Sequence, residues 1–422
     1  MIGTLDPHHR EATVIGAGIS GLLVAHTLKQ RGFKVRVYDS APRAGGLIET
    51  RQTRFGPAET AAHSLMVNER VSQFFSEIGV DLVPVRKESK ARYIYRNGKM
   101  RRFPLTFRET LFTLRRFFSK PLRPIDPATA SLADWASAHL GEPALKNLLA
   151  PFVTGVYATT PEDLRLAIAF PSLVPTDPTR SFFWNLWAAR KKSGRKKNRP
   201  TMMTPLRGME SVISNLKESL GTDLVLNHPI DELPDVPNLI LCIPPPDLAR
   251  LIEKVDPESA VALGRVKASP LVTVTAFVRS TDFIGGAPKG VGVLIPRNEG
   301  LRLLGVLFNS SSFPGRSHDP ETVSLTLMLG GTTDPAALRL ADEDLRGLMT
   351  RELGILLGFR GELQHCEITR WNSAIPAYSD ELVRARELLS KGFFSKPGRV
   401  AFTNYSKDVS IRGMIEALQL LA

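Results

Sequence analysis

One glycine-spaced segment near the N-terminus constrains the fold more than any other part of the chain. It reads VIGAGISGLLVAHTLKQRGFKVRVYD and spans residues 14–39. An apolar run over 12–15 predicts a strand, apolar residues at helical spacing over 19–30 predict a helix, and alternation over 34–38 predicts a second strand. A strand, a glycine turn, a helix and a strand in this order are typical of a unit that binds a dinucleotide.

The three glycines of this segment have distinct physical roles. Gly16, Gly18 and Gly21 lie on the turn and the first helical turn, where a missing side chain permits a tight bend, the approach of a pyrophosphate and close packing of the helix. The N-terminus of the helix then offers unpaired N–H groups to phosphate. Asp39 closes the second strand, where a carboxylate accepts hydrogen bonds from ribose hydroxyls and repels a 2′-phosphate.

The block that follows indicates which dinucleotide is bound. In APRAGG, Arg43, Gly45 and Gly46 offer a cation and a bare backbone to the same pyrophosphate. Here the chain resembles the flavin amine oxidase superfamily, whose members carry an Arg-x-Gly-Gly block after the ribose acid. The resemblance implies FAD as the cofactor.

Length and composition limit the remaining possibilities. A chain of 422 residues exceeds one hydrophobic core, so we expect two or three domains. The two cysteines, Cys242 and Cys366, lie in no zinc or thiol-exchange pattern, and we expect no metal site. The first thirteen residues lack the apolar centre of a signal peptide, and no apolar run reaches the length of a membrane span, so we expect a cytoplasmic protein.

Four further segments narrow the resemblance to the protoporphyrinogen and coproporphyrinogen oxidases of the haem pathway. They are ARYIYRNGKMRRFPLT (91–106), LLAPFVTGVYATTPEDLRLAIAFPSL (148–173), TLMLGG (326–331) and WNSAIPAYSDELVRARELL (371–389). The resemblance implies an α/β fold in which a Rossmann-type FAD-binding domain accompanies a strand-rich substrate domain and a helical, membrane-associating domain. We expect the FAD-binding domain over 1–86, 205–262 and 371–422, the helical region over 87–204 and the strand-rich region over 263–370.

The resemblance also carries site residues onto matching positions of this chain. The implied substrate contacts are Arg92, Gly292, Leu294 and Met328. The implied cofactor contacts are Gly16, Ala17, Gly18, Ile19, Ser20, Gly21, Asp39, Ser40, Arg43, Gly46, Leu47, Ala61, Ala62, His63, Ser64, Ile230, Asn404, Val409, Ser410 and Ile411. No residue is assigned as a catalytic acid or base, because the flavin is the electron sink.

The implied activity is the FAD-dependent oxidation of protoporphyrinogen IX to protoporphyrin IX by successive hydride transfers to flavin N5, with oxygen or a quinone as electron acceptor. Coproporphyrinogen III is the alternative substrate. A third possibility is that the chain oxidises another apolar substrate of the superfamily. Ala61, Thr403 and Asp408 replace glycines that are usual in the family. These replacements leave open a weakly active or inactive paralogue that binds tetrapyrroles, and other haem-pathway enzymes are further candidate partners.

The charge of the chain points to an anionic partner. Lys and Arg outnumber Asp and Glu by 55 to 42. Residues 106–123 predict a basic amphipathic helix with Phe107, Leu111, Leu114 and Phe118 at helical spacing, and residues 181–199 join aromatic residues to seven basic ones. Aromatic residues beside a polybasic run are typical of an anionic membrane interface. We therefore expect peripheral attachment to the inner face of the cell membrane. A core helix with a solvated loop is the alternative, and nucleic-acid binding is not expected because no fold signature for it is present.

Overall fold

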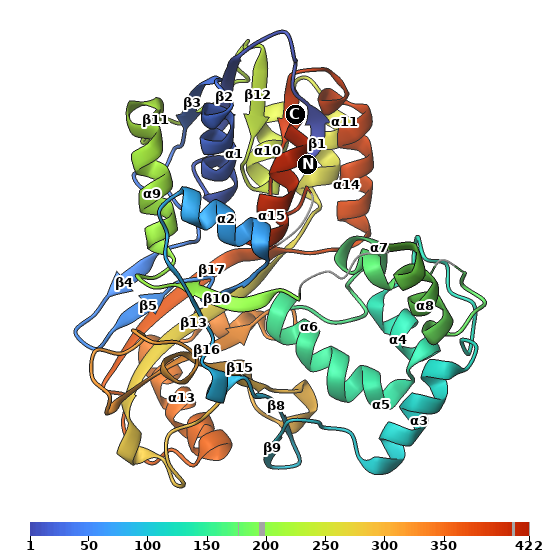
Figure 1. Cartoon of the computed structure of the whole chain (residues 1–422), viewed down its shortest axis with the longest axis vertical. Coiled ribbons are helices and arrows are strands. Elements are labelled where there is room, and N and C mark those ends of the chain that lie inside the picture. Colours follow the sequence, from blue (N-terminus) through green and yellow to red (C-terminus); the bar gives the residue numbers. More distant parts are fainter. Residues whose placement is uncertain (176, 194–198, 407–409, 422) are drawn as a thin grey trace.

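The computed structural model describes residues 1–175, 177–193, 199–406 and 410–421. Figure 1 shows three parts: a sheet that lies near both termini, a second sheet at the other end of the molecule, and a lobe of helices beside it. The two sheets are built from segments that alternate along the sequence, so neither part is a continuous stretch of chain.

The first sheet has six strands in the order β1-β18-β12-β2-β3-β11, and all its pairs are parallel except β1 with β18. Its strands are β1 (Ile2–Thr4), β2 (Glu11–Ile15), β3 (Lys34–Tyr38), β11 (Leu224–Val225), β12 (Asn238–Leu241) and β18 (Arg399–Ala401). Helix α1 (Ile19–Gln30) joins β2 to β3. The strand, helix and strand predicted from the glycine segment are therefore confirmed, with the same bounds for α1 and β3.

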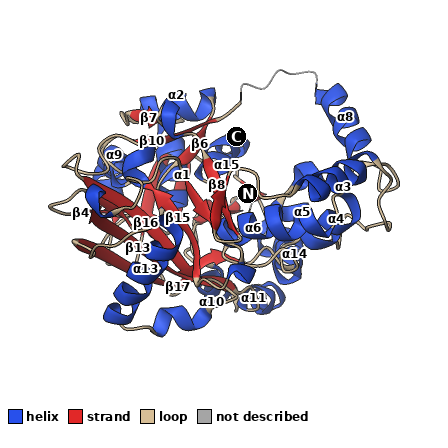
Figure 2. Ribbon diagram, turned by 90° about the horizontal axis from the view of Figure 1, so that it is seen from below, coloured by secondary structure: helices blue, strands red, loops and turns tan. Residues whose placement is uncertain are grey.

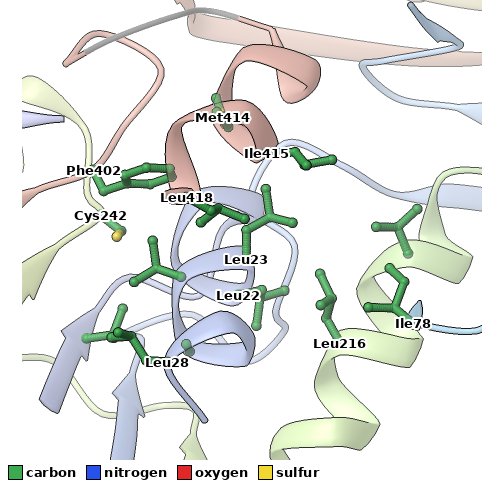
Figure 3. Close-up of a cluster of buried hydrophobic side chains, with 14 of the residues drawn as sticks. Leu22, Leu23, Leu28, Ile78, Leu216, Cys242, Phe402, Met414, Ile415 and Leu418 are labelled. Atoms are coloured by element: carbon green, nitrogen blue, oxygen red, sulfur yellow. The ribbon is translucent and has the colours of Figure 1, made fainter. Parts of the chain in front are cut away.

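Helix α1 is buried because its apolar residues face the sheet and two neighbouring helices. Leu22, Leu23 and Leu28 are fully buried. Figure 3 shows them among side chains of α9 (Glu210–Leu220) and α15 (Ile411–Ala417). Burial of each leucine contributes about 1.5–3 kcal/mol, so this packing fixes the glycine turn that precedes the helix.

The second sheet has seven strands in the order β17-β13-β16-β15-β14-β8-β9, all antiparallel except the β14 and β8 pair. Its strands are β8 (Arg92–Arg96), β9 (Lys99–Arg101), β13 (Ala268–Arg279), β14 (Gly292–Leu294), β15 (Leu303–Phe308), β16 (Thr322–Gly330) and β17 (His365–Pro376). One face packs under α13 (Asp342–Leu357) through buried residues such as Val293, Val306 and Leu327. The hairpin β8–β9 joins this sheet although it precedes the helical lobe in sequence, and β17 runs through the expected boundary at residue 371.

The helical lobe lies between β9 and β10 in sequence. Its helices are α3 (Phe107–Phe118), α4 (Leu132–His139), α5 (Glu142–Ala144), α6 (Ala150–Tyr157), α7 (Leu166–Ala169) and α8 (Phe182–Ser193), with a π-helical turn over Leu145–Leu149. Figure 2 shows α3, α4 and α8 together at one side of the molecule, away from the strands. Trp135 and Phe182 meet edge to face at 4.8 Å and join α4 to α8. Among the helices that the structure describes, none has the length and apolar character needed to cross a membrane.

Shorter elements connect these parts. They are β4 (Thr50–Gln52), β5 (Pro57–Glu59), β6 (Leu65–Val67), α2 (Glu69–Glu77), β7 (Leu82–Pro84), β10 (Thr201–Pro205), α10 (Pro245–Ile252), α11 (Pro257–Gly264), α12 (Asn309–Ser312) and α14 (Asp380–Lys391). Strand β10 pairs with β6 and β7 in a three-stranded sheet, and β4 pairs with β5. The chain thereby passes from the first sheet to the second through the segment that contains residues 57–67.

Candidate functional site

Two glycine turns lie against each other at the end of β2. Gly16 has φ +102°, and a Cβ on Gly21 would lie 1.8 Å from the carbonyl oxygen of Gly16, so no side chain fits there. The N–H of Gly45 donates to the carbonyl of Ala17 at 2.8 Å. A Cβ on Gly46, which has φ +61°, would lie 3.3 Å from Cα of Gly18. Bare backbone at the N-terminus of α1 fits a pyrophosphate.

Asp39 and Arg43 flank these turns but differ in their present contacts. The carboxylate of Asp39 accepts from the N–H groups of Ala17 at 2.5 Å and Ala41 at 2.8 Å, which holds it beside the glycine turn. Arg43 donates to the carbonyls of Ala44 at 2.6 Å and Ile48 at 2.5 Å. In this structure the guanidinium therefore stabilises the loop to which Arg43 belongs. A contact with phosphate would have to use the N–H groups that these two bonds leave free.

His63 places an unpartnered ring nitrogen in the loop between β5 and β6. Its Nδ1 lies 3.4 Å from the hydroxyl of Thr326, whereas its Nε2 is buried without a hydrogen-bond partner among the described residues. Burial, with a smaller contribution from Arg316, lowers the pKa of His63 to about 3, so the ring is neutral near pH 7. A buried ring nitrogen without a partner costs free energy, and a bound ligand would relieve that cost. This orphaned atom and the glycine turns fit the expected cofactor.

The loop that carries His63 is tied to the second sheet. The carbonyl of Thr60 accepts from the indole N–H of Trp371 at 3.0 Å and from the hydroxyl of Thr273 at 2.9 Å. The carbonyl of His63 accepts from the hydroxyl of Thr204 at 2.8 Å. Residues expected at the flavin are thus held beside β13 of the second sheet, whose partner β16 carries the expected substrate contact Met328.

A buried ion pair lies where this loop begins, at the end of β5. Arg316 lies 2.7 Å from Glu59, and their side chains are 5% and 3% exposed. Arg316 also donates to the hydroxyl of Thr204, and Glu59 accepts from the hydroxyl of Thr50 at 2.7 Å and the N–H of Met209 at 3.0 Å. Burial raises the pKa of Glu59 from its ordinary value, and Arg316 opposes that rise. The sequence analysis missed this pair.

The face of the second sheet that does not pack under α13 is here called the site face. Residues directly opposite each other on paired strands share a face. One row across it consists of Arg92, Gly292, Leu307, Thr326 and Thr275. The next row consists of Ile94, Leu294, Gly305, Met328 and Thr273.

The site face brings all four expected substrate residues together. Leu294 and Met328 are half-buried and Arg92 is exposed, whereas Gly292 leaves its position in the row without a side chain. Thr273 and Thr326, which contact the loop 60–64, belong to the same two rows. The alternation of Thr with Val and Leu over 271–278 and 322–329 was the signal in the sequence that could have identified them.

Helix α6 lies against one end of the site face. A Cβ on Gly155 would lie 2.4 Å from Cδ2 of Leu294, so the missing side chain permits this close approach. Phe152 and Val156 on the same helix are 39% and 45% exposed. The helix therefore adds apolar surface next to Leu294.

Three residues of the chain, Ala61, Thr403 and Asp408, replace glycines that are usual in the family, and the structure describes the backbone at the first two. Neither Ala61 nor Thr403 has a positive φ, so the backbone there does not require glycine. Thr403 forms a turn with Ser406, whose N–H donates to the Thr403 hydroxyl at 3.1 Å. Asp408 and Val409 lie outside the described residues.

The other expected cofactor residues of this region lie on different elements. The carbonyl of Asn404 accepts from the hydroxyl of Tyr378 at 2.7 Å. Ser410 caps α15 by accepting from the N–H of Gly413 at 3.0 Å, and Ile411 begins that helix. The side chain of Ile230 is half-buried and packs against a buried apolar cluster.

Comparison with known proteins adds family information to this geometry. The family model described as flavin containing amine oxidoreductase matches residues 19–235. Protoporphyrinogen oxidase 2, chloroplastic/mitochondrial, of Arabidopsis thaliana is 25% identical, with coverage of 97% of this chain and 93% of that protein. Human protoporphyrinogen oxidase is 23% identical, with coverage of 90% and 91%. A crystal structure from Exiguobacterium sp. 255-15, described as a candidate protoporphyrinogen oxidase, shares the fold with a TM-score of 0.77 and 18% identity over 98% of both chains.

Proposed function

The chain belongs to the family of flavin containing amine oxidoreductases, whose members bind FAD, and from this premise we propose that it oxidises a porphyrinogen. Protoporphyrinogen IX is the first candidate substrate. The observation that carries the proposal is the site face, where an exposed arginine without an ion-pair partner among the described residues stands at the edge of a surface of glycine, threonine and larger apolar side chains. The near full-length similarity to protoporphyrinogen oxidases supports the same substrate class.

The chemistry of a porphyrinogen matches this arrangement. It is a large, apolar macrocycle with carboxylate arms on one edge, so its site needs an apolar floor and a fixed cation at the rim. From Arg92 to Thr326 the row crosses three strand spacings, about 14 Å. A macrocycle whose carboxylate meets Arg92 therefore extends over Gly292 toward Thr326 and the loop that holds His63.

FAD, when bound, supplies the electron sink for the substrate carbon and passes the electrons on to oxygen or a quinone. The residues of the chain bind and orient. Arg92 fixes the carboxylate edge, Leu294 and Met328 support the ring, and Phe152 and Val156 of α6 shield it from water. A neutral His63 acts as a hydrogen-bonding group at this site and not as a cation.

Two alternatives follow from the same site. Coproporphyrinogen III differs from the first candidate in its number of carboxylates and fits the same floor. A tetrapyrrole carrier without oxidase activity was suggested by replaced glycines, but the backbone conformations of Ala61 and Thr403 do not favour it. If the test below shows bound flavin but no reaction with a porphyrinogen, other apolar substrates of the superfamily are the next candidates.

The test mixes the purified protein with protoporphyrinogen under anaerobic conditions, follows the visible absorbance of the flavin, and then admits oxygen. We expect the flavin to bleach with saturating kinetics and porphyrin fluorescence to exceed the autoxidation control. The Arg92→Ala variant should raise the KM about tenfold or more, and Arg279→Ala, an exposed arginine at the far end of β13, is the matched control. Bound flavin that never bleaches with any porphyrinogen would refute the proposal.

We also propose peripheral attachment to an anionic membrane through α3 and α8. No residue of α3 is buried, and Phe107 and Leu111 are 83% and 59% exposed, which argues against the alternative of a core helix for α3. Trp184 and Trp187 of α8, which contacts α3, are 49% and 50% exposed. Aromatic and aliphatic side chains next to arginines favour a lipid interface with negative headgroups.

Flotation with liposomes tests this attachment. The protein should float with phosphatidylserine-containing vesicles and less with neutral ones, and Phe107→Ser with Leu111→Ser should reduce flotation. Val261→Ser, at an exposed apolar residue of α11, is the control. If the variant with Phe107→Ser and Leu111→Ser floats as well as the Val261→Ser control with both kinds of vesicle, attachment through α3 is contradicted.

A further inference from the structure

The hairpin β8–β9 places a second arginine on the site face. Ile94 lies directly opposite Arg101, so both side chains are on the same face. Tyr95 and Met100, the neighbouring opposed pair, turn to the other face and join the core under α13. Arg101 is therefore at the outer end of the row that contains Leu294 and Met328.

Arg92 and Arg101 are diagonal neighbours across this hairpin. On antiparallel strands such neighbours have Cβ atoms about 7–8 Å apart, within reach of long side chains. Both arginines are exposed, and among the described residues neither has an ion-pair partner. Within the described part of the chain, the side chain of Arg92 donates only to the sulfur of Met202 at 3.8 Å, and that of Arg101 only to the carbonyl of Arg96 at 3.5 Å.

The third arginine of the hairpin is neutralised. Arg96 makes a two-pronged contact with Glu109 at 2.7 and 2.8 Å, and this contact lowers the pKa of Glu109 to about 2. Two like charges that remain unpaired on diagonal positions repel each other, and an anion with two negative groups would remove the repulsion. Among the arginines of the hairpin, the contrast with Arg96 leaves Arg92 and Arg101 as the pair available to a ligand.

We propose that Arg101 is a second carboxylate-binding residue of the substrate site, which together with Arg92 receives two neighbouring carboxylate arms of one porphyrinogen. The inference rests on the proposed function, because it concerns the ligand of the same site face. The ring would then lie over Gly292 and Leu294, with one arm directed to each of two adjacent strands. A substrate with a single carboxylate, or with its acids esterified, would use half of this rim or none of it.

The experiment measures binding of protoporphyrin IX and of its dimethyl ester to the FAD-loaded protein by fluorescence titration, which requires no turnover. The variants are Arg92→Gln, Arg101→Gln and the double variant. The control is Arg102→Gln, at the exposed arginine just past the end of β9. Thermal unfolding of each variant checks that the fold is retained.

We expect Arg101→Gln to weaken protoporphyrin binding about tenfold, as Arg92→Gln does, while binding of the dimethyl ester stays unchanged in both. In the double variant the preference for the free acid over the ester should disappear. If Arg101→Gln binds like Arg102→Gln while Arg92→Gln is impaired, the inference is wrong and the proposed function stands. If the unmodified protein binds neither compound, the inference and the proposed function both fail.

Discussion

Replacing Arg316 with methionine would leave Glu59 as a buried acid without its counter-charge. The side chains of this pair are 5% and 3% exposed, so water does not reach either group. Methionine retains most of the length of the arginine side chain and removes only the guanidinium. Glu59 keeps two donors, the hydroxyl of Thr50 and the N–H of Met209.

The expected loss follows from this geometry. Breaking a buried ion pair by removing one partner costs about 3–5 kcal/mol. Because Glu59 keeps two donors, we expect a value near the lower end, about 3 kcal/mol of unfolding free energy at neutral pH. The double variant Arg316→Met with Glu59→Gln should recover most of that loss, because glutamine carries no charge and still meets Thr50 and Met209.

The loss should also depend on pH with a defined sign. Without Arg316 only the hydrogen bonds from Thr50 and Met209 oppose the burial that already raises the pKa of Glu59 above its ordinary value of 4.5, so that pKa should rise further. An acid whose pKa is raised in the folded state contributes stability below its unfolded pKa, and that contribution is lost as the pH rises through the folded pKa. Arg316→Met should therefore be closer to the unmodified protein at about pH 4 than at neutral pH.

The assay is urea unfolding followed by intrinsic fluorescence at both pH values for the single variant, the double variant and the unmodified protein. Val255→Ala, at an exposed residue near the end of α10, is the control. A single variant that loses less than about 1 kcal/mol at neutral pH would refute the reasoning. A double variant that is no more stable than the single variant would refute it as well. An equal loss at both pH values would refute the assignment of the cost to the charge of Glu59.

Three further predictions concern other parts of the molecule. Gly21→Ala places a Cβ 1.8 Å from the carbonyl oxygen of Gly16, so it should abolish FAD retention, which the visible spectrum of the purified variant reports. The bond from Arg96 holds the pKa of Glu109 at about 2, so its stabilisation should be complete above pH 4.5 and fall as the pH drops toward 2; Glu109→Gln should flatten the pH dependence of thermal unfolding in that range. Burial raises the pKa of the Cys242 thiol, so a maleimide reagent should label it only after unfolding, and labelling of the native protein would contradict its burial.

The local features of the fold were predictable because they depend on neighbours in the sequence. The bounds of α1 and β3 follow from the spacing of their apolar residues and from Gly16 and Gly21, which indicate a tight turn before the helix. The amphipathic helix α3 was also predicted, and its N-cap at Thr106 is a local signal. Assignment to the flavoprotein family was equally a matter of local motifs.

The candidate site was predictable only in part. Arg92, Gly292, Leu294 and Met328 came from resemblance, and the sequence alone does not tell that they share one face. That fact depends on the register of strands separated by some two hundred residues, and a slip of one residue would turn each side chain to the opposite face.

The sequence by itself therefore determined the dinucleotide unit, the cofactor class and the basic, aromatic character of the helical lobe, since each is written in short-range spacing. Tertiary structure decided which strands pair and which residues lie beside each other. It joined β8–β9 to a sheet otherwise formed by residues after 267, brought Glu59 to Arg316 across 257 positions, and placed Arg101 beside Arg92. Such pairings are long-range because a sheet selects its partners by burial and register over the whole chain, which no local pattern encodes.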